Sequence, residues 1–241
     1  SSYNFQFLID AFTSKKTNSV EDKSTSEPLD IIIGNLNLED INVDFKDDVL
    51  AIDSKFKIGS LDASMESLNL EKMIFKTHDI SLSDADVKFI QNPITIALPV
   101  EEVPLPTFSA ESITIKNTKA YYKSEVDNIL ADANINDFYT EIPELNLKNK
   151  TFNLNKIRLK NSAILMKMKT VENTVVSSSI NTTKVIWPEI AIKINDLNLE
   201  NNNIKYFING AIVQKNVFNP NAISLQNLNL KVTDVYLKDQ K

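Results

Sequence analysis

The side chains that could take part in catalysis or metal binding are few and scattered. His78 is the single histidine among the 241 residues, and there is no cysteine. Acid pairs such as Asp47/Asp48 and Asp84/Asp86 could act as hydrolytic carboxylates or as calcium ligands. No DxDxDG loop, GxSxG, P-loop or GxGxxG motif accompanies them. The sequence therefore predicts no catalytic residue, no metal site, no cofactor and no enzymatic activity.

Charge and composition exclude further classes of function. The chain carries 26 Lys and Arg against 32 Asp and Glu, which gives a formal net charge of −6, and it has no basic run. An electrostatic nucleic-acid binder needs clustered cations to displace counterions, so we expect no nucleic-acid partner. No window approaches ~20 apolar residues, the length of a membrane-spanning helix. The hydrophobic fraction of 42% is nevertheless enough to order a chain of this size.

Two compositional features bear on the backbone. The chain has only 3 Gly but 29 Asn, whereas an average chain has roughly 7% Gly. After Gly, Asn enters the left-handed backbone conformation most readily, and it favours turns and bulges. We therefore expect Asn at the positions where strands turn or bulge.

The beginning of the chain differs in pattern from the rest. Its apolar residues fall at positions i, i+3, i+4 and i+7: Phe5, Leu8, Ile9 and Phe12. This spacing predicts a short amphipathic helix over residues 1–12. Residues 13–28 are polar, with Val20 as their only large apolar residue. They predict a flexible linker that precedes a β-region over residues 29–241.

From residue 29 onward, apolar and polar residues alternate. Such alternation is typical of strands with one apolar face and one face in water. Two stretches interrupt it. Residues 91–109 contain four of the eight prolines and predict an extended excursion rather than a central strand. Residues 171–184 are polar and predict a loop or hairpin tip.

An internal repeat runs through this region. Six segments share the pattern φ-x-φ-x-[D/N]-x-x-φ-x-φ, where φ is an apolar residue: 36–45, 80–89, 113–122, 157–166, 197–206 and 228–237. The fifth position is Asp or Asn in five copies and Val232 in the sixth. The copies begin 44, 33, 44, 40 and 31 residues apart. This uneven spacing favours a meander with turns of variable length over a solenoid of identical coils.

The motif contains a change of parity. Leu36 and Leu38 share one face of a strand, but Val43 and Phe45 have the opposite parity and would point the other way on a regular strand. A bulge or a one-residue jog near Asp40 would return all four to the same side. Asp and Asn tolerate the left-handed conformation that a bulge often needs. The same bulge in strand after strand should curl the sheet about one line.

The apolar face of such a sheet must be covered. Only one short helix is available, and no second sheet pattern is visible. We therefore expect an all-β fold, an elongated and curved U-shaped antiparallel sheet whose concave face is an apolar groove. The alternative that the residues leave open is an ordinary sandwich core filled by its own side chains.

Three segments resemble the TamB-type, AsmA-like envelope proteins of the Bacteroidota. The run YNFQFLIDAF (3–12) is similar to their short helix, and LDIIIGNLNLEDINVDFKDD (29–48) and MESLNLEKMIFKTHDISLSDADVKFIQ (65–91) are similar to their repeated β-segments. The resemblance implies a U-shaped sheet called a β-taco. It also implies an internal section of a longer periplasmic protein that is anchored in the inner membrane. It implies phospholipid transport between the inner and outer membranes, linked to outer-membrane biogenesis.

The resemblance also implies partners and site residues. The partners are phospholipid acyl chains and, through parts of the full chain not present here, an outer-membrane barrel assembly protein; this section would be a monomer. The alternative function is a structural scaffold for outer-membrane protein assembly with a filled core. The residues expected to line the lipid groove are the apolar positions of the motif: Leu36, Leu38, Val43, Phe45, Leu82, Val87, Phe89, Ile113, Ile115, Ile157, Leu159, Ile164, Leu197, Leu199, Ile204, Leu228, Leu230 and Val235.

Overall fold

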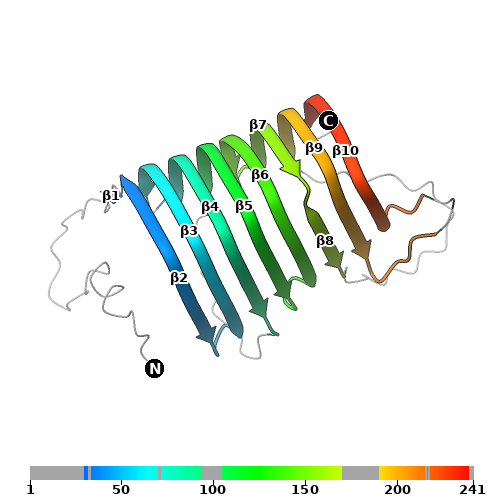
Figure 1. The fold of residues 1–241 in the computed structure, drawn as a ribbon, viewed down its shortest axis with the longest axis horizontal. Helices are drawn as coiled ribbons and strands as arrows, with labels where there is room; N and C mark the ends of the chain where they lie inside the picture. The colour runs from blue at the N-terminus through cyan, green and yellow to red at the C-terminus, as the bar shows by residue number, and fades with distance from the viewer. Residues whose placement is uncertain are drawn as a thin grey trace, which may run out of the picture.

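The chain forms one long β-sheet (Figure 1). The computed structural model describes residues 30–31, 34–69, 72–93, 105–169, 190–214, 216 and 218–238. The strands are β1 (Asp30–Ile31), β2 (Asn35–Asp47), β3 (Ile52–Asn69), β4 (Ile74–Gln91), β5 (Thr107–Ser124), β6 (Ile129–Asn146), β7 (Thr151–Lys160), β8 (Ala163–Met168), β9 (Ala191–Ile208) and β10 (Ala222–Leu237). The helix predicted over residues 1–12 and the linker predicted over 13–28 lie outside the described residues, as do 94–104 and 170–189.

The strands follow one another across the sheet in chain order. β1 and β2 both pair with β3, and β7 and β8 lie end to end between β6 and β9. Most neighbouring strands are antiparallel, but β4 pairs with β5 in parallel, and β7 and β8 pair with β9 in parallel. The prediction of an antiparallel sheet was therefore wrong at two places. A hairpin needs a short turn, whereas long connections over 92–106 and 169–190 return the chain to the opposite end of the sheet before the next strand begins.

The proline-rich excursion is shorter than predicted. Gln91 is the last residue of β4, and Thr107, Phe108 and Ser109 already belong to β5. The N–H of Thr107 donates to the carbonyl oxygen of Met73 across the sheet at 2.9 Å. The connection between the two parallel strands therefore covers residues 92–106.

Strands β2–β4 and β5–β8 are two copies of one unit, which consists of a motif strand, a return strand and a second motif strand. Corresponding residues of the two copies are 77 positions apart: Asp40 and Asn117, Gly59 and Asn136, Asp84 and Asn161. The uneven spacing of the motif follows from this unit. Motif copies begin 44 residues apart where a return strand intervenes, and 33 or 40 apart where two motif strands pair in parallel.

The sixth motif copy is different in kind. It lies in β10, which occupies the position of the return strands β3 and β6 and runs against the five motif strands. Val232 does not adopt a positive φ, whereas Asn227 and Asp234 do, at 49° and 55°. The alignment of residues 228–237 with the other five copies was therefore wrong in its register.

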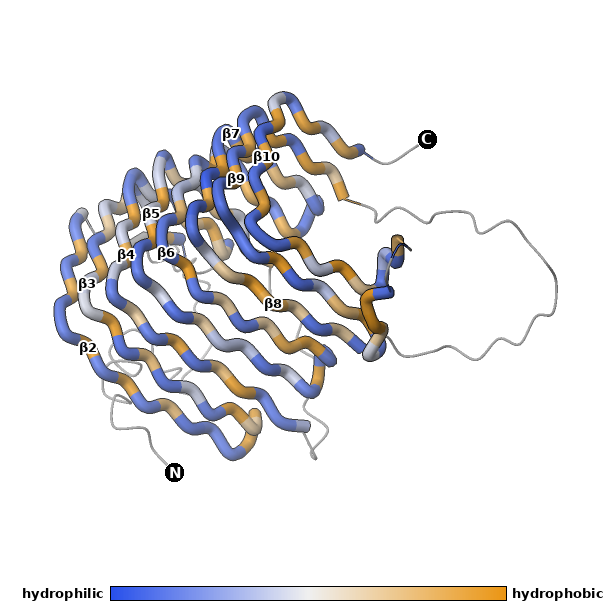
Figure 2. The backbone as a smooth tube through the Cα atoms, turned by 45° about the vertical axis from the view of Figure 1, so that its right-hand side comes forward, coloured by the Kyte–Doolittle hydropathy of each residue, from blue (hydrophilic) through white to orange (hydrophobic). Residues whose placement is uncertain are grey.

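Every motif strand bends at the Asp or Asn of the motif. The fifth residue has a positive φ in all five motif strands: Asp40 51°, Asp84 53°, Asn117 46°, Asn161 49° and Asn201 53°. This confirms the predicted left-handed residues. The cross-strand register runs through Asp40, Asp84 and Asn117 without a shift, so each of these is a one-residue jog rather than a bulge with an extra residue. The register brings these residues, with Gly59 and Asn136, into one row across the sheet, which we call the fold line. The sheet folds over along this line (Figure 2).

Burial identifies the inside of the fold. The residues that directly follow the bend are small or polar, and they are buried: Ala85, Thr118, Ser162 and Asn202. The bend residues Asp84, Asn117, Asn161 and Asn201 are exposed. Side chains on the concave side of a bend crowd together and lose accessible surface. The buried residues that follow the bend residues therefore lie on the concave side. We call the side of the sheet that carries these buried residues the inner face, and the opposite side the outer face.

Candidate functional site

Two apolar rows flank the fold line. The Leu38 row follows cross-strand pairs over the whole sheet: Leu38, Leu61, Leu82, Ile115, Phe138, Leu159, Leu199 and Leu230. The Val43 row does the same on the other side of the line: Val43, Phe56, Val87, Ala120, Ala133, Ile164, Ile204 and Leu225. Residues paired across strands share a face. Each row therefore forms one apolar stripe perpendicular to the strands.

The left-handed bend residues place both stripes on the inner face. In β4 the less exposed residues have even numbers before Asp84, as in Ile80 and Leu82, and odd numbers after it, as in Val87 and Phe89. A regular strand would keep one parity and send the two halves to opposite sides. The left-handed jog at Asp84 keeps the apolar side chains on one side.

Two further rows lie outside the first two. The Leu36 row contains Leu36, Ala63, Ile80, Ile113, Thr140, Ile157, Leu197 and Val232. The Phe45 row contains Phe45, Ser54, Phe89, Tyr122, Ala131, Met166, Tyr206 and Ile223. Within the Phe45 row, the rings of Phe89 and Tyr122 stack with centroids 5.4 Å apart. The four rows together make the inner face apolar on both sides of the fold line.

All but two of the predicted lining residues lie in these four rows. Leu228 pairs with Asn202 at the fold line, and Val235 pairs with Ile194 beyond the Leu36 row. The sequence analysis missed the residues that the return strands contribute, such as Phe56, Leu61 and Phe138. These strands carry no motif, and their period-two alternation was the only signal that could have placed them.

The inner face has no covering layer among the described residues. Only six apolar residues are buried among all the described residues, and four of them are alanines: Ala63, Ala85, Ala110, Ile142, Leu159 and Ala222. The large side chains of the four rows are otherwise half-buried or exposed. Exposure is highest on the edge strands, at 44% for Val43 and 40% for Leu230. A packed interior would bury such side chains almost completely.

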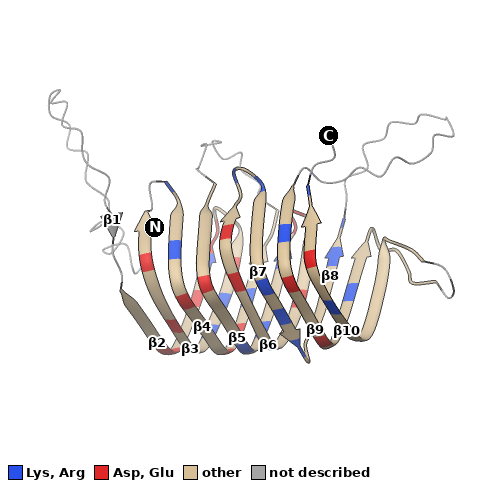
Figure 3. Ribbon diagram, turned by 90° about the horizontal axis from the view of Figure 1, so that it is seen from above, with Lys and Arg blue, Asp and Glu red and all other residues tan. Residues whose placement is uncertain are grey.

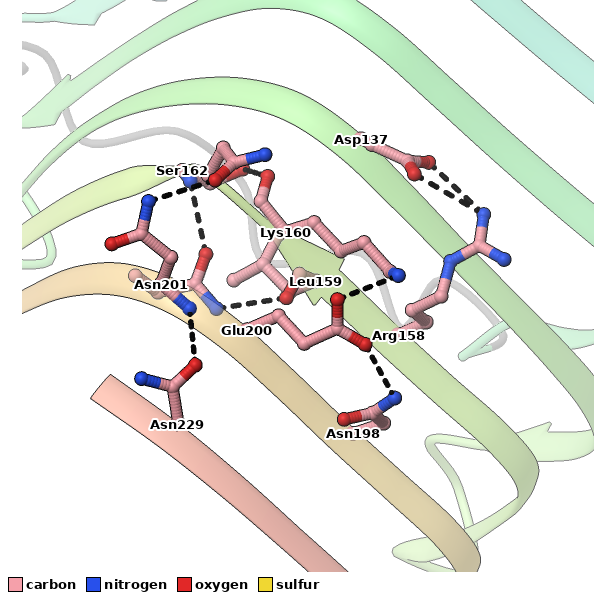
Figure 4. Close-up of polar contacts among 11 residues, drawn as sticks. Asp137, Arg158, Leu159, Lys160, Ser162, Asn198, Glu200, Asn201 and Asn229 are labelled. Carbon is pink, nitrogen blue, oxygen red and sulfur yellow. Dashed lines mark hydrogen bonds and ion pairs between the residues drawn. The ribbon is translucent and has the colours of Figure 1, made fainter. Parts of the chain in front are cut away.

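The outer face carries cross-strand ion pairs. Figure 3 marks the Lys, Arg, Asp and Glu residues along the strands. Arg158 pairs with Asp137 across β6 and β7 at 3.1 Å, and Lys160 pairs with Glu200 across β7 and β9 at 2.6 Å. Figure 4 shows these pairs beside the fold line. Lys160, followed by Asn198, lowers the pKa of Glu200 by hydrogen bonding to its carboxylate. Both signs of charge alternate between strands, so the outer face suits contact with water.

Amide side chains satisfy the backbone at the fold line. Asn202 is fully buried; its Oδ1 accepts from the N–H of Ser162 at 2.9 Å and its Nδ2 donates to the carbonyl oxygen of Leu159 at 2.8 Å. The N–H of Asn201 donates to Oδ1 of Asn229 at 3.0 Å. The ladder of paired residues between β7–β8 and β9 is interrupted at the bend, between Lys160 and Ala163. These side chains replace the lost partners.

The candidate chemical residues lie in turns and cross-strand pairs. His78 lies at the β4–β5 pair with its Nδ1 2.9 Å from Oε1 of Glu111, and that hydrogen bond raises the pKa of His78. Asp47 accepts from the N–H groups of Val49 and Leu50 and closes the β2–β3 turn. No group of three or more His, Asp or Glu side chains able to hold a metal ion occurs among the described residues. Their geometry assigns these side chains to turns and cross-strand pairs.

Comparison with known proteins adds no relative. No protein-family model, curated protein or solved structure matches this chain. The strands contain all the regular structure of the described residues, where no helix is long and apolar enough to cross a membrane.

Proposed function

We propose that the inner face is a hydrophobic groove that holds lipid acyl chains. The chain would be one section of a periplasmic protein, anchored in the inner membrane, that moves phospholipids between the inner and outer membranes. The observation that supports this proposal is the partial exposure of the four apolar rows. Their large side chains form continuous stripes over the sheet and stay partly exposed, because no described element packs on them.

The energetics favour a passive role for these side chains. Transfer of each methylene from water to an apolar surface contributes about 0.8 kcal/mol. Leu, Ile, Val and Phe recur on strand after strand in the same rows, so a chain lying along the groove meets similar surface at each step. Such uniform contact permits sliding, whereas one deep pocket would retain the chain.

The polar parts of the lipid would remain in water at the open side of the fold. The outer-membrane barrel assembly protein that the sequence resemblance implies would be engaged by other parts of a longer protein. The alternative role, a scaffold for outer-membrane protein assembly, requires that the inner face be filled rather than free for lipid.

Copurifying lipid tests the proposal. The chain would be purified without detergent and analysed by native mass spectrometry, with extraction and identification of bound lipid. We expect phospholipid with the wild type and a loss of at least tenfold in Leu82→Glu and Phe89→Glu, which place a charge in two different rows. The matched controls Ser81→Glu and Lys88→Glu alter the adjacent outer-face residues and should retain lipid.

Circular dichroism would confirm that all four variants keep the sheet. Absence of lipid from the folded wild type, or equal lipid in folded Leu82→Glu and Phe89→Glu, would refute the groove and leave the scaffold role.

A further inference from the structure

The loop between β9 and β10 departs from the repeat. The equivalent hairpin loops of the first two units, residues 48–51 and 125–128, have four residues each, whereas residues 209–221 form a loop of thirteen. This longer loop carries exposed apolar side chains: Ile212 is 76%, Val213 is 47% and Phe218 is 82% exposed. Large apolar side chains gathered on a loop commonly mark a binding site.

The first part of this loop lines one side of a cavity at the ends of β8 and β9. The cavity measures about 530 Å³ and is lined by Lys167, Met168, Lys169, Phe207 and residues 210–213. Its apolar lining comes from Met168, Phe207 and the loop. A space of this size and character suits the terminal part of a single acyl chain.

The cavity lies at the ends of β8 and β9, beyond the last pair of the Phe45 row. Lys167 pairs with Phe207 on the side of the sheet opposite to the Met166 and Tyr206 pair. Met168 lies on the same side as that pair, and its Sδ is 3.6 Å from the hydroxyl of Tyr206. The cavity therefore takes its lining from both faces at the strand ends and leaves the rest of the groove proposed above free.

Two lysine side chains, Lys167 and Lys169, line this cavity. Lys167 and Lys169 lie on either side of Met168, and no ion pair joins either ammonium group to another described residue. By contrast, Lys46 and Lys123, at the ends of β2 and β5, pair with Asp48 and Glu125 at 3.0 and 2.7 Å. The cations at the ends of these two strands are neutralised, whereas Lys167 and Lys169 have no ion pair among the described residues. Glu125 lines the neighbouring depression that Lys167 and Lys169 share, and its carboxylate is paired with Lys123.

We propose that this cavity binds an anionic amphiphile, with its acyl chain against Met168, Phe207 and the loop, and its phosphate or carboxylate group at Lys167 and Lys169. A second depression of about 420 Å³ shares Lys167, Met168 and Lys169 and reaches Pro93 and Leu130. The head group therefore lies where the two depressions meet. Charge and apolar surface are adjacent, which is the arrangement that an amphiphile requires.

Methyl NMR with titration of dodecyl phosphate below its critical micelle concentration tests this site. The δ1-methyl signal of Ile212 reports on the cavity, and that of Ile115 on the inner face. We expect saturable shifts of the Ile212 signal and at least tenfold weaker binding in the double variant Lys167→Gln/Lys169→Gln. Inorganic phosphate alone should produce no comparable shift, and uncharged dodecyl maltoside should bind at least tenfold more weakly at Ile212.

Separate outcomes overturn the proposal. Equal affinity of the double variant, equal binding of dodecyl maltoside, or an equal effect of inorganic phosphate would each refute an amphiphile site with a cationic head-group region. Shifts of the Ile115 signal alone would assign binding to the groove instead. The Phe89→Glu variant should bind dodecyl phosphate at Ile212 with unchanged affinity, so failure of the groove and failure of this site can be distinguished.

Discussion

Asn202 shows how a single side chain supports the bend. It is fully buried, and both ends of its amide bond the backbone of the β7–β8 segment, at Ser162 and Leu159. Leucine has a similar volume but neither a donor nor an acceptor. Asn202→Leu would leave a buried N–H and a buried carbonyl without partners, which costs about 2–4 kcal/mol of the free energy of unfolding.

Urea denaturation measures this effect. Asn155 provides the control, because its Oδ1 accepts a bond from Asn195 at an exposed position and no backbone group depends on it. We expect Asn155→Leu to change the free energy of unfolding by less than about 1 kcal/mol. Equal losses in the two variants would contradict the role given to Asn202.

His78 makes stability depend on pH. The hydrogen bond and the charge of Glu111 raise its pKa above the ordinary value of 6.5. The stabilisation from the protonated pair is complete below the pKa of the unfolded chain and is lost as the pH rises through the raised pKa of the folded chain. We therefore expect His78 to contribute more to the free energy of unfolding at about pH 5.5 than at about pH 8.5.

The contribution is obtained by comparing the wild type with His78→Gln in urea at both pH values. The difference between the two proteins should shrink as the pH rises. Both side chains are largely exposed, so the effect is small. Glu111→Gln should abolish the pH dependence of the difference, and a difference that grows with pH would show that the pKa is lowered instead.

The bends show what could be inferred from sequence at the scale of the strand. The change of parity, together with Asp or Asn at the fifth motif position, predicted left-handed residues in five strands, and all five have positive φ. This worked because the apolar alternation and the side-chain preference pointed to the same residue. The strand directions could not be inferred in this way, since alternation is the same in parallel and antiparallel neighbours.

The order of the motif spacings contained a signal for those directions. The first three spacings are 44, 33 and 44 residues. A spacing of 44 is long enough for a motif strand and a return strand, whereas a spacing of 33 leaves room only for a motif strand and a connection. The parallel pairs could therefore have been predicted from these spacings. The cavity at Lys167 and Lys169 could not, because it depends on where a long loop meets the end of a neighbouring strand.

Gly59 tests the fold line on a return strand. A Cβ atom at this position would lie 2.9 Å from Cβ of Asp84 and 3.2 Å from its carbonyl oxygen, so the bend of β4 would have to shift. We expect Gly59→Ala to lower the free energy of unfolding by about 1–3 kcal/mol.

Gly34→Ala is the matched control, because a Cβ at Gly34 would meet nothing within 4 Å. It should be neutral or slightly stabilising in the same urea experiment, since alanine lowers the entropy of the unfolded chain. A tolerated Gly59→Ala would mean that β3 and β4 can separate at the fold without cost.

The open inner face has a consequence for the stability of the whole molecule. A ligand that covers the four rows would bind the folded chain and not the unfolded one, and so raise the melting temperature. At a free concentration of 100 Kd the gain is about 2.7 kcal/mol, or roughly 5–10 °C for a chain of this size. Dodecyl maltoside is a suitable probe because it lacks charge and should bind weakly at the Lys167 and Lys169 cavity.

Differential scanning calorimetry at increasing dodecyl maltoside below its critical micelle concentration measures this shift. The increase should be lost in Leu82→Glu and retained in Ser81→Glu. A melting temperature that falls or stays constant in the wild type would show that the inner face offers no site for an apolar chain.

The 77-residue unit allows the length of the sheet to change while its cross-section stays the same. Neighbouring units meet through two strands of the same direction whose bends coincide, as β4 and β5 do at Asp84 and Asn117. Tandem duplication of a unit would insert three strands, an extension of about 14 Å, while every wall and bend kept its shape. The length of the sheet could thus increase in fixed steps through gene duplication. The inner and outer faces along the sheet would stay unchanged.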